Sequence, residues 1–392
     1  MAQTLHPGPL GGRVEKELDT MTYFLLESNK TTSKEKYTQI ACIVAFCVFS
    51  FVYLYFYQQD VLAAAQHVLS GGKTHYDRTV GAVLITLTLY LLQKVVASFV
   101  KLDKWAYAFT FFPSLLTLTI ITDVSTTIHK GFSFGGWWVA VPLLLVLFYG
   151  GTRFLVKNKV TLFTHTTWLR DLWVNLALMI LMFLLVGLFS NSQDVFHYRM
   201  RMEKLIAEEK YDKALKVGRR SLATDPSLTM LRVYALAQKG LLGDQLFHYP
   251  VESTSSQLLP DGDEVCTLIL NDTIINDFAK TREGRIQYRL IGYLVDRDLE
   301  HFATLVRKVY PDTIIPRHYA EAMLLYQFYS GTPIPEGENH VVETDFRNFR
   351  KMERSYPKEE ARNHLRREFG NTYWYYYKYK PRVRSDYKVL RF

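Results

Sequence analysis

The side chains best suited to acid–base chemistry lie in one polar stretch, residues 58–78, between two hydrophobic segments. Its histidines and aspartates could act as general acid and base, and its lysine and arginine could hold an anionic head group. A metal site is less favoured, because the spacing of His67 and His75 matches no known pattern of zinc ligands. The simpler interpretation is a capped loop with solvated surface charges. The candidate outer-loop polar cluster consists of Asp60, His67, Lys73, His75, Asp77 and Arg78.

A second candidate lies near the end of the sequence, where aromatic and basic residues are interleaved from Thr372 to Arg384. This composition could stack on nucleobases, bind anionic lipid or glycan, or dock a protein partner. Alternatively, the aromatic rings complete a helical core and only the last basic residues stay in solvent. The candidate partner-binding residues are Tyr373, Trp374, Tyr375, Lys378, Lys380 and Arg382.

Single polar residues within or beside the hydrophobic segments are weaker candidates. An ionisable residue inside a membrane helix is a functional candidate in general. Lys94, however, lies near the end of its segment, where a long side chain can reach the interface. Asp123 and Asn175 could line a polar path. Solvation of a helix end and a hydrogen bond between helices are the simpler roles for those two.

Five hydrophobic segments must position these residues. The clearest is Leu172–Phe189, which holds no ionised side chain. At about 1.5 Å per residue it can cross a hydrocarbon core of roughly 30 Å. The mean hydropathy of −0.04 hides such segments, because it averages an apolar first half with a polar second half. The predicted spans of the transmembrane bundle, 37–190, are about 37–57, 79–100, 105–122, 136–156 and 172–190.

Lysines and arginines in the short connections predict the orientation. Roughly eleven lie on the side of the N-terminus and three on the opposite side, and cytoplasmic connections are the ones enriched in Lys and Arg. We therefore expect a multi-pass protein of the bacterial inner membrane with its N-terminus in the cytoplasm. Because the number of spans is odd, the C-terminal half then lies in the periplasm or, more generally, outside the cytoplasm. Residues 1–36 form a disordered cytoplasmic arm in this interpretation, with Met1 or Met21 as the start.

The second half, residues 195–392, shows helical patterns separated by proline and glycine. Lys210–Pro226 is similar to the second helix and exit turn of a tetratricopeptide repeat (TPR), and Ser227–Gly240 to the first helix of the next repeat. After a loop at 249–263, successive helices suggest stacked hairpins. The fold predicted for the whole chain is therefore all-α, a five-span bundle followed by a TPR-like, solenoid-like domain. The later helices are predicted at Arg285–Tyr310, Arg317–Tyr329, Thr344–Tyr356 and Lys358–Phe369.

Four segments together resemble an uncharacterised family of bacterial integral membrane proteins with a TPR-like C-terminal domain. The resemblance covers most of the chain from the first span onward and implies an inner-membrane protein of unknown activity. It brings no catalytic residues. The segments are QQDVLAAAQHVLSGGKTHYDR, FHYRMRMEKL, SLTMLRVYALAQKGLLGDQLFHYP and TYWYYY.

Two functions from different classes are compatible with these features. The first is a membrane-anchored binding or scaffold module, with the lipid bilayer and another envelope protein or glycan as partners and no nucleic acid. The second is a membrane enzyme or flippase-like factor that acts on a lipid-linked envelope substrate at the outer leaflet, with Asp60, His75 and Asp77 as its reactive groups. The binding module is favoured. The three cysteines show neither disulfide nor metal-ligand spacing, and no cofactor is expected.

Overall fold

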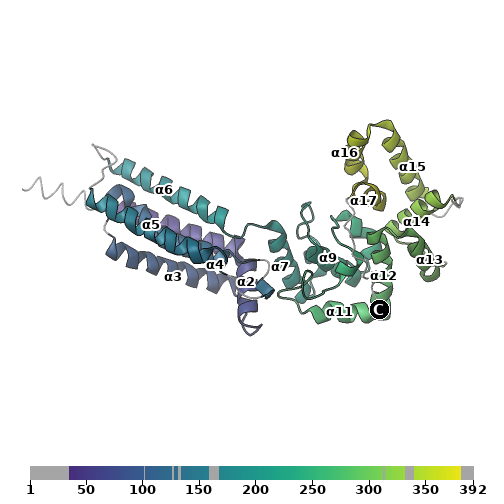
Figure 1. Cartoon of the computed structure of the whole chain (residues 1–392), viewed down its shortest axis with the longest axis horizontal. Coiled ribbons are helices and arrows are strands. Elements are labelled where there is room, and N and C mark those ends of the chain that lie inside the picture. Colours follow the sequence, from purple (N-terminus) through teal and green to yellow (C-terminus); the bar gives the residue numbers. More distant parts are fainter. Residues whose placement is uncertain are drawn as a thin grey trace, which may run out of the picture. The chain divides into compact units, whose positions relative to one another are not determined.

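The computed structural model describes residues 35–100, 102–125, 128–130, 134–158, 167–311, 314–331 and 340–380. The described residues are predominantly helical and include no strand, which confirms the all-α prediction (Figure 1). They form two compact units, each with its own buried core. The first unit comprises residues up to Ala65 together with His75–Ser192, and the second comprises Gln66–Thr74 together with the chain from Gln193 onward. The expected arm lies almost entirely outside the described residues.

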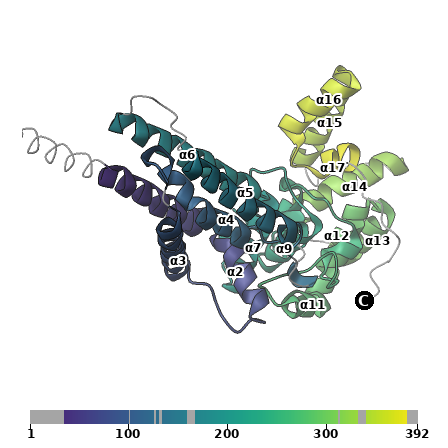
Figure 2. The ribbon, with the colours of Figure 1, turned by 60° about the vertical axis from the view of Figure 1, so that its left-hand side comes forward.

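The first unit contains five helices that are long and apolar enough to cross a membrane, as the sequence predicts. Figures 1 and 2 show these helices running side by side. A shorter helix, α2 (Gln59–Leu69), follows the first of them. The five are Glu35–Tyr57, α3 (Arg78–Phe99), the continuous stretch of η2 (Lys104–Phe111) and α4 (Phe112–Thr122), α5 (Trp137–Lys157) and α6 (Trp168–Phe189).

The five helices differ in how much of their surface the unit covers. In its most apolar window, Lys104–Thr122 has 61% of its residues buried, against 6% for α5. The stretch of η2 and α4 is therefore the centre of the bundle, and α5 lies at its edge. Aliphatic side chains cover the exposed faces of the helices, as expected of surfaces that contact lipid.

Asn175 and Asp123, the two polar residues that could line a path, have hydrogen-bond partners within the first unit. The side-chain nitrogen of Asn175 donates to the carbonyl oxygens of Lys104 and Asp171 at 2.8 and 2.7 Å, and its oxygen accepts from the N–H of Ala108 at 2.7 Å. Asp123 accepts from Trp137 Nε1 at 2.7 Å. The hydrogen bonds of Asn175 and Asp123 thus agree with structural roles for both residues. Lys94 is exposed, and its ammonium lies over the ring of Tyr90, one turn toward the start of α3 rather than toward its end.

The second unit is built from short helices around one continuous core, which contains most of its buried aromatic rings. Polar residues that accept backbone N–H groups begin several helices, namely Asp225, Thr281, Asp298 and Thr372. The helices are α7 (Asp194–Ala207), α8 (Tyr211–Ala214), α9 (Pro226–Gln238), α10 (Leu242–Gln245), η4 (Leu246–His248), η5 (Ser255–Leu258), α11 (Asp272–Lys280), α12 (Arg282–Asp296), α13 (Leu299–Val309), α14 (Arg317–Ser330), α15 (His340–Ser355), α16 (Lys358–Phe369) and α17 (Tyr373–Tyr379).

The predicted TPR helix at Lys210–Pro226 is wrong. Only one turn, α8, is helical, and the chain then continues in tighter turns such as the 3.0 Å bond from Val217 N–H to the Ala214 carbonyl oxygen. Gly218 prevents continuation, because its φ of +60° favours glycine and a Cβ there would lie 2.8 Å from the ring of Tyr198. The first predicted repeat therefore lacks its second helix.

Two further differences concern helix boundaries. The single helix predicted over Arg285–Tyr310 is two helices, α12 and α13, separated at Arg297, whose φ is +63°. The helix α11 was not predicted, although Asn271 before it caps it by accepting from the N–H of Thr273.

Candidate functional site

The outer-loop polar cluster divides between the two units: His67 and Lys73 belong to the second, and the other four residues to the first. Asp77 caps α3, and its Oδ1 accepts from the N–H groups of Thr79 and Val80 at 2.9 and 2.8 Å. The guanidinium of Arg78 lies 4.8 Å from the ring centre of Tyr55. These roles agree with a capped loop. Asp60, His67 and His75 also take part in interactions within the protein.

The aromatic residues of the C-terminal candidate are core residues. Tyr373 and Trp374 are fully buried, so a partner cannot reach these two rings from outside, whereas Tyr375 is 4% exposed and lines the cavity described below. They complete the second unit's core, as the alternative interpretation holds. Lys378 pairs with Glu353 at 2.6 Å. Arg382 lies outside the described residues.

Glu321 on α14 holds this aromatic segment in place. Its Oε2 accepts from the N–H of Tyr373 at 2.7 Å and lies 3.0 Å from Nδ1 of His318. Its backbone oxygen accepts from Trp374 Nε1 at 2.7 Å. The carboxylate is completely buried, and Arg317 Nε also donates to it at 3.1 Å. α17 is thus fixed to α14 at a defined position.

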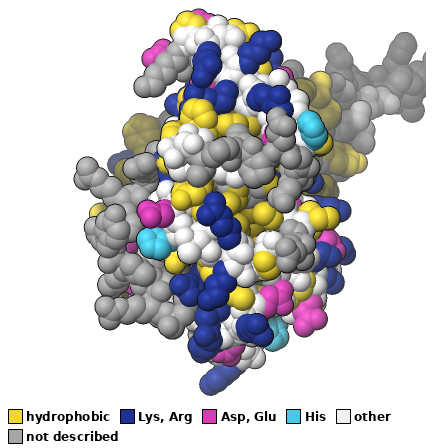
Figure 3. Space-filling view, turned by 90° about the vertical axis from the view of Figure 1, so that its right-hand side faces the viewer, with side chains coloured by type: hydrophobic (Ala, Val, Ile, Leu, Met, Phe, Trp, Pro, Cys, Tyr) yellow, Lys and Arg dark blue, Asp and Glu magenta, His cyan; other side chains and the backbone are white. Residues whose placement is uncertain are grey.

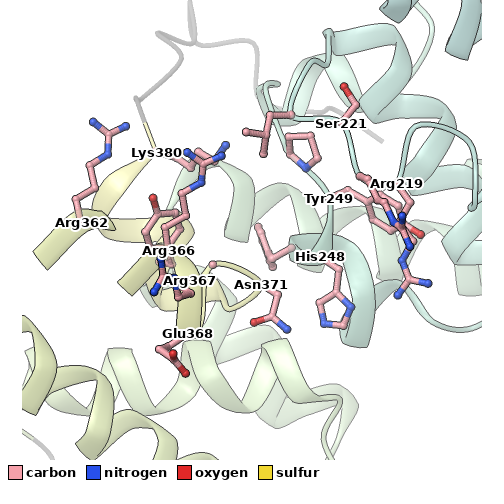
Figure 4. Close-up of a pocket in the computed structure, with 16 residues that line it drawn as sticks. Arg219, Ser221, His248, Tyr249, Arg362, Arg366, Arg367, Glu368, Asn371 and Lys380 are labelled. Atoms are coloured by element: carbon pink, nitrogen blue, oxygen red, sulfur yellow. The ribbon is translucent and has the colours of Figure 1, made fainter. Parts of the chain in front are cut away.

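The remaining member of the candidate, Lys380, lines a cavity of about 500 Å³ within the second unit. Three separated parts of the chain form it: the turns after α8, η4 with the two residues that follow it, and the chain from α16 to the residue after α17. Figure 4 shows Arg362, Arg366, Arg367 and Lys380 on one side of the cavity and Arg219 on the other. We call it the basic pocket. Its lining residues are Arg219, Arg220, Ser221, Leu222, Phe247, His248, Tyr249, Pro250, Arg362, Arg366, Arg367, Glu368, Gly370, Asn371, Tyr375 and Lys380.

The helix α16 presents its arginines to the pocket because another of its faces is anchored in the core. Ala361 and Leu365, four residues apart, are buried in the core. Arg362 and Arg366 follow each of them by one residue and are therefore one turn apart on an exposed face. Like charges at this spacing repel each other. Without a bound ligand, α16 therefore carries an electrostatic repulsion between Arg362 and Arg366, which a bound anion would reduce.

The floor and the second wall of the pocket are rigid. Tyr249 is buried, and its hydroxyl donates to the carbonyl oxygen of Leu215 at 2.9 Å. The carbonyl oxygen of Lys380 accepts from the guanidinium of Arg297 at 2.6 Å, which fixes the end of α17 beside the pocket.

The electrostatics of the pocket favour an anion. None of its five arginines forms an ion pair within the described chain, and Glu368 is the one carboxylate among the lining residues. Burial, followed by the nearby charge of Arg366, lowers the pKa of Lys380. Burial, followed by the neighbouring His318, lowers the pKa of His248 to about 4, so His248 is neutral at pH 7. Basic side chains also predominate among the charged ones on the face drawn in Figure 3.

The side chains that line the basic pocket are suited to binding an anion. Arginine guanidinium groups present paired N–H donors that fit the oxygens of phosphate and carboxylate. Ser221 and Asn371 add neutral hydrogen-bonding groups. In the described part of the chain, no three His, Cys, Asp or Glu side chains gather as a metal site would require.

Sequence reasoning found Lys380 but missed the five arginines of the pocket. Two signals were available: the adjacent pair Arg219-Arg220, and the set Arg362, Arg366 and Arg367 on one predicted helix. More than 100 residues separate the two sets, so only the fold shows that they surround one cavity.

Comparison with known proteins yields one family. Neither curated proteins nor solved structures gave a match. A family model matches residues 129–275 and 280–380, which include every lining residue of the basic pocket. Of the four segments that carry the resemblance, the match includes the last three and leaves out the polar stretch at 58–78. Since the match covers more than half of the chain, the protein belongs to the family of unknown function DUF6057.

Proposed function

We propose that the protein is a binding module anchored in the bacterial inner membrane, and that its second unit lies outside the cytoplasm and binds an anionic envelope component, a glycan or lipid head group, in the basic pocket. The observation that carries the proposal is the convergence on one cavity of five arginines that have no ion pair among the described residues. The five apolar helices of the first unit supply the anchor, and the distribution of Lys and Arg along the sequence supports the orientation.

The contrast with other arginines of the same unit supports a role in binding. Arg199, Arg317 and Arg350 each pair with a carboxylate, at 3.4, 3.1 and 2.5 Å. The fold thus supplies a counter-charge to these three, while Arg297 donates instead to the carbonyl oxygens of Tyr376 and Lys380. Within the part of the chain that the structure describes, the five arginines of the pocket have no carboxylate partner, which leaves their N–H donors available to a ligand.

The pocket also has a suitable size. Its volume of about 500 Å³ falls within the range of roughly 300–1,000 Å³ that is typical of small-molecule sites. Aromatic rings at its base, from Phe247, Tyr249 and Tyr375, give a ligand a firm surface. One sugar-sized group with its charged substituents would fit.

The alternative function, a membrane enzyme with Asp60, His75 and Asp77 as reactive groups, gains no support from the described residues, because Asp77 is engaged as a helix cap. Alanine substitution at these three positions separates the two functions. Retention of a deletion-complementing phenotype by the triple variant would exclude the enzyme.

The test of the proposal is direct binding by the full-length protein in detergent. Calorimetric titration with sulfated or phosphorylated oligosaccharides at low salt should give saturable binding that weakens as salt is added. The double variant Arg219→Ala/Arg366→Ala should lose it. Arg354→Ala is the matched control, because Arg354 is an exposed arginine of α15 outside the pocket. Binding that is absent, or equal in all three proteins, contradicts the proposal.

A further inference from the structure

The distribution of charge in the basic pocket defines its ligand more closely, and this step rests on the function proposed above. Six cationic side chains and one carboxylate line the cavity, a net charge of +5 while His248 is neutral. One phosphate group carries about −1.5 to −2 at pH 7, which leaves most of this charge uncompensated. Two phosphate groups bring about −3 to −4. The charge balance therefore calls for at least two such groups.

The placement of the cations leads to the same conclusion. Figure 4 shows Arg219 across the cavity from Arg362, Arg366 and Arg367. These side chains come from segments held to the core on opposite sides, by Tyr249 and Leu215 on one and by Ala361 and Leu365 on the other. In a space of about 500 Å³, a single phosphate bound at one wall would leave the opposite wall without a counter-charge.

The type of cation favours phosphate over carboxylate. Five of the six are arginines, whose planar guanidinium groups bind two oxyanion oxygens at once. A carboxylate offers one negative charge and a phosphate nearly two. Two phosphates on one compact body therefore offset most of the net charge of +5, with about −3 to −4 in two groups, whereas the same charge would take three or four carboxylates.

We infer that the basic pocket binds a ligand with two phosphate groups on one compact polar body, one phosphate at the arginines of α16 and the other at Arg219 and Arg220. Ser221 and Asn371, which also line the cavity, are placed to contact the body between them. The same chemistry occurs in free bisphosphorylated sugars and in the head groups of bisphosphorylated lipids. The two sources are separated by experiment.

A matched pair of probes tests the inference. Full-length protein in neutral-lipid nanodiscs is titrated with fructose 1,6-bisphosphate and with fructose 6-phosphate, which differ by one phosphate. We expect the bisphosphate to bind about tenfold more tightly or better, since one added charge-assisted hydrogen-bonded group contributes on this order. Cosedimentation with vesicles that contain diphosphoryl lipid A, which has two phosphate monoesters, or monophosphoryl lipid A, which has one, tests the lipid source in the same way.

Variants of the two walls complete the design. Arg219→Ala and Arg366→Ala should each reduce the preference for the bisphosphate, and Arg354→Ala should leave it unchanged. The substituted side chains are exposed, so the variants should fold, and their melting temperatures check this. Equal affinities for the two sugars, with sensitivity to one wall only, would overturn the inference and leave anion binding intact. Absence of binding by every probe would overturn both.

Discussion

Glu203 on α7 is a completely buried carboxyl that fastens a loop to its helix. Its Oε2 accepts from the N–H groups of Leu268 and Ile269 at 2.7 Å each. Burial raises the pKa of Glu203 from 4.5 to about 7, although the N–H donors and Arg199 favour the charged form. Between these two values the folded chain holds the proton more firmly than the unfolded chain. The stability that Glu203 contributes is therefore complete below pH 4.5 and is lost as the pH rises through about 7.

The variant Glu203→Gln tests this, because an amide oxygen can still accept from the loop but does not titrate. We expect the melting temperature of the wild type to fall relative to that of the variant as the pH is raised from about 5 to about 8. Glu300→Gln, at an exposed position on α13, is the control and should follow the wild type. Differential scanning fluorimetry across this range gives the comparison. Parallel curves for wild type and Glu203→Gln would contradict the assigned role.

The stability that His248 contributes depends on pH in the opposite direction to that of Glu203. Its pKa is lowered to about 4, with burial as the main cause, followed by His318, while Glu321 acts in the other direction and Arg317 and Arg219 act with His318. The neutral form favoured by folding contributes stability above about pH 6.5, and this is lost as the pH falls toward 4. A bound phosphate would raise the pKa of His248, so ligand binding and protonation of this residue reinforce each other.

Glu321 allows a prediction about the aromatic segment. Replacing it with alanine removes the acceptor of His318 and of the N–H of Tyr373, both buried. Each unsatisfied buried group costs about 1–3 kcal/mol, so the loss of an acceptor for two such groups should destabilise the second unit by roughly 2–6 kcal/mol. Trp374, fully buried in the wild type, should show a red-shifted emission. Its fluorescence in Glu321→Ala, compared with Glu300→Ala, provides the measurement, and an unchanged spectrum would show that α17 is held by other contacts.

At the level of elements, α16 combines an apolar face in the core with a row of arginines toward the pocket. Arg362→Glu places a carboxylate one turn before Arg366, an arrangement that stabilises helices by about 0.2–0.5 kcal/mol. It also removes a like-charge repulsion. We expect a slightly higher melting temperature together with weaker anion binding, measured by fluorimetry and calorimetry on the same preparation. A variant that loses both stability and binding would show that Arg362 serves the fold instead.

The elements also show what the sequence can and cannot predict. The five apolar helices, α9, α14 and α16 were predicted to within a few residues, because their hydrophobic residues recur at helical spacing or their ends carry proline and glycine. The helix at Lys210–Pro226 was wrong, since the effect of Gly218 depends on the ring of Tyr198 from another helix. The break at Arg297 likewise lies at a residue type that rarely adopts a positive φ.

The basic pocket could be predicted only in part. A row of arginines on an amphipathic helix usually means a solvated face, and the sequence alone favours that interpretation of α16. What distinguishes these residues is the second set, Arg219 and Arg220, which the tertiary fold brings to the same cavity. The aromatic residues near the C-terminus are the reverse case: their composition is also typical of a binding surface, but the rings belong to the core, as one of the two interpretations of the sequence holds.

At the scale of the whole molecule, the proposed function depends on which side of the membrane holds the pocket. An odd number of crossings separates the two ends of the chain, and the Lys and Arg distribution favours a cytoplasmic N-terminus. Alkaline phosphatase fused after Phe392 should therefore be active, and a green fluorescent protein fused there should stay dark. Fusions after Lys130, at a connection predicted to be outer, and after Lys157, at one predicted to be inner, serve as paired controls. A fluorescent fusion after Phe392 with inactive phosphatase would place the pocket in the cytoplasm, and its ligand would then have to be a phosphorylated molecule of that compartment.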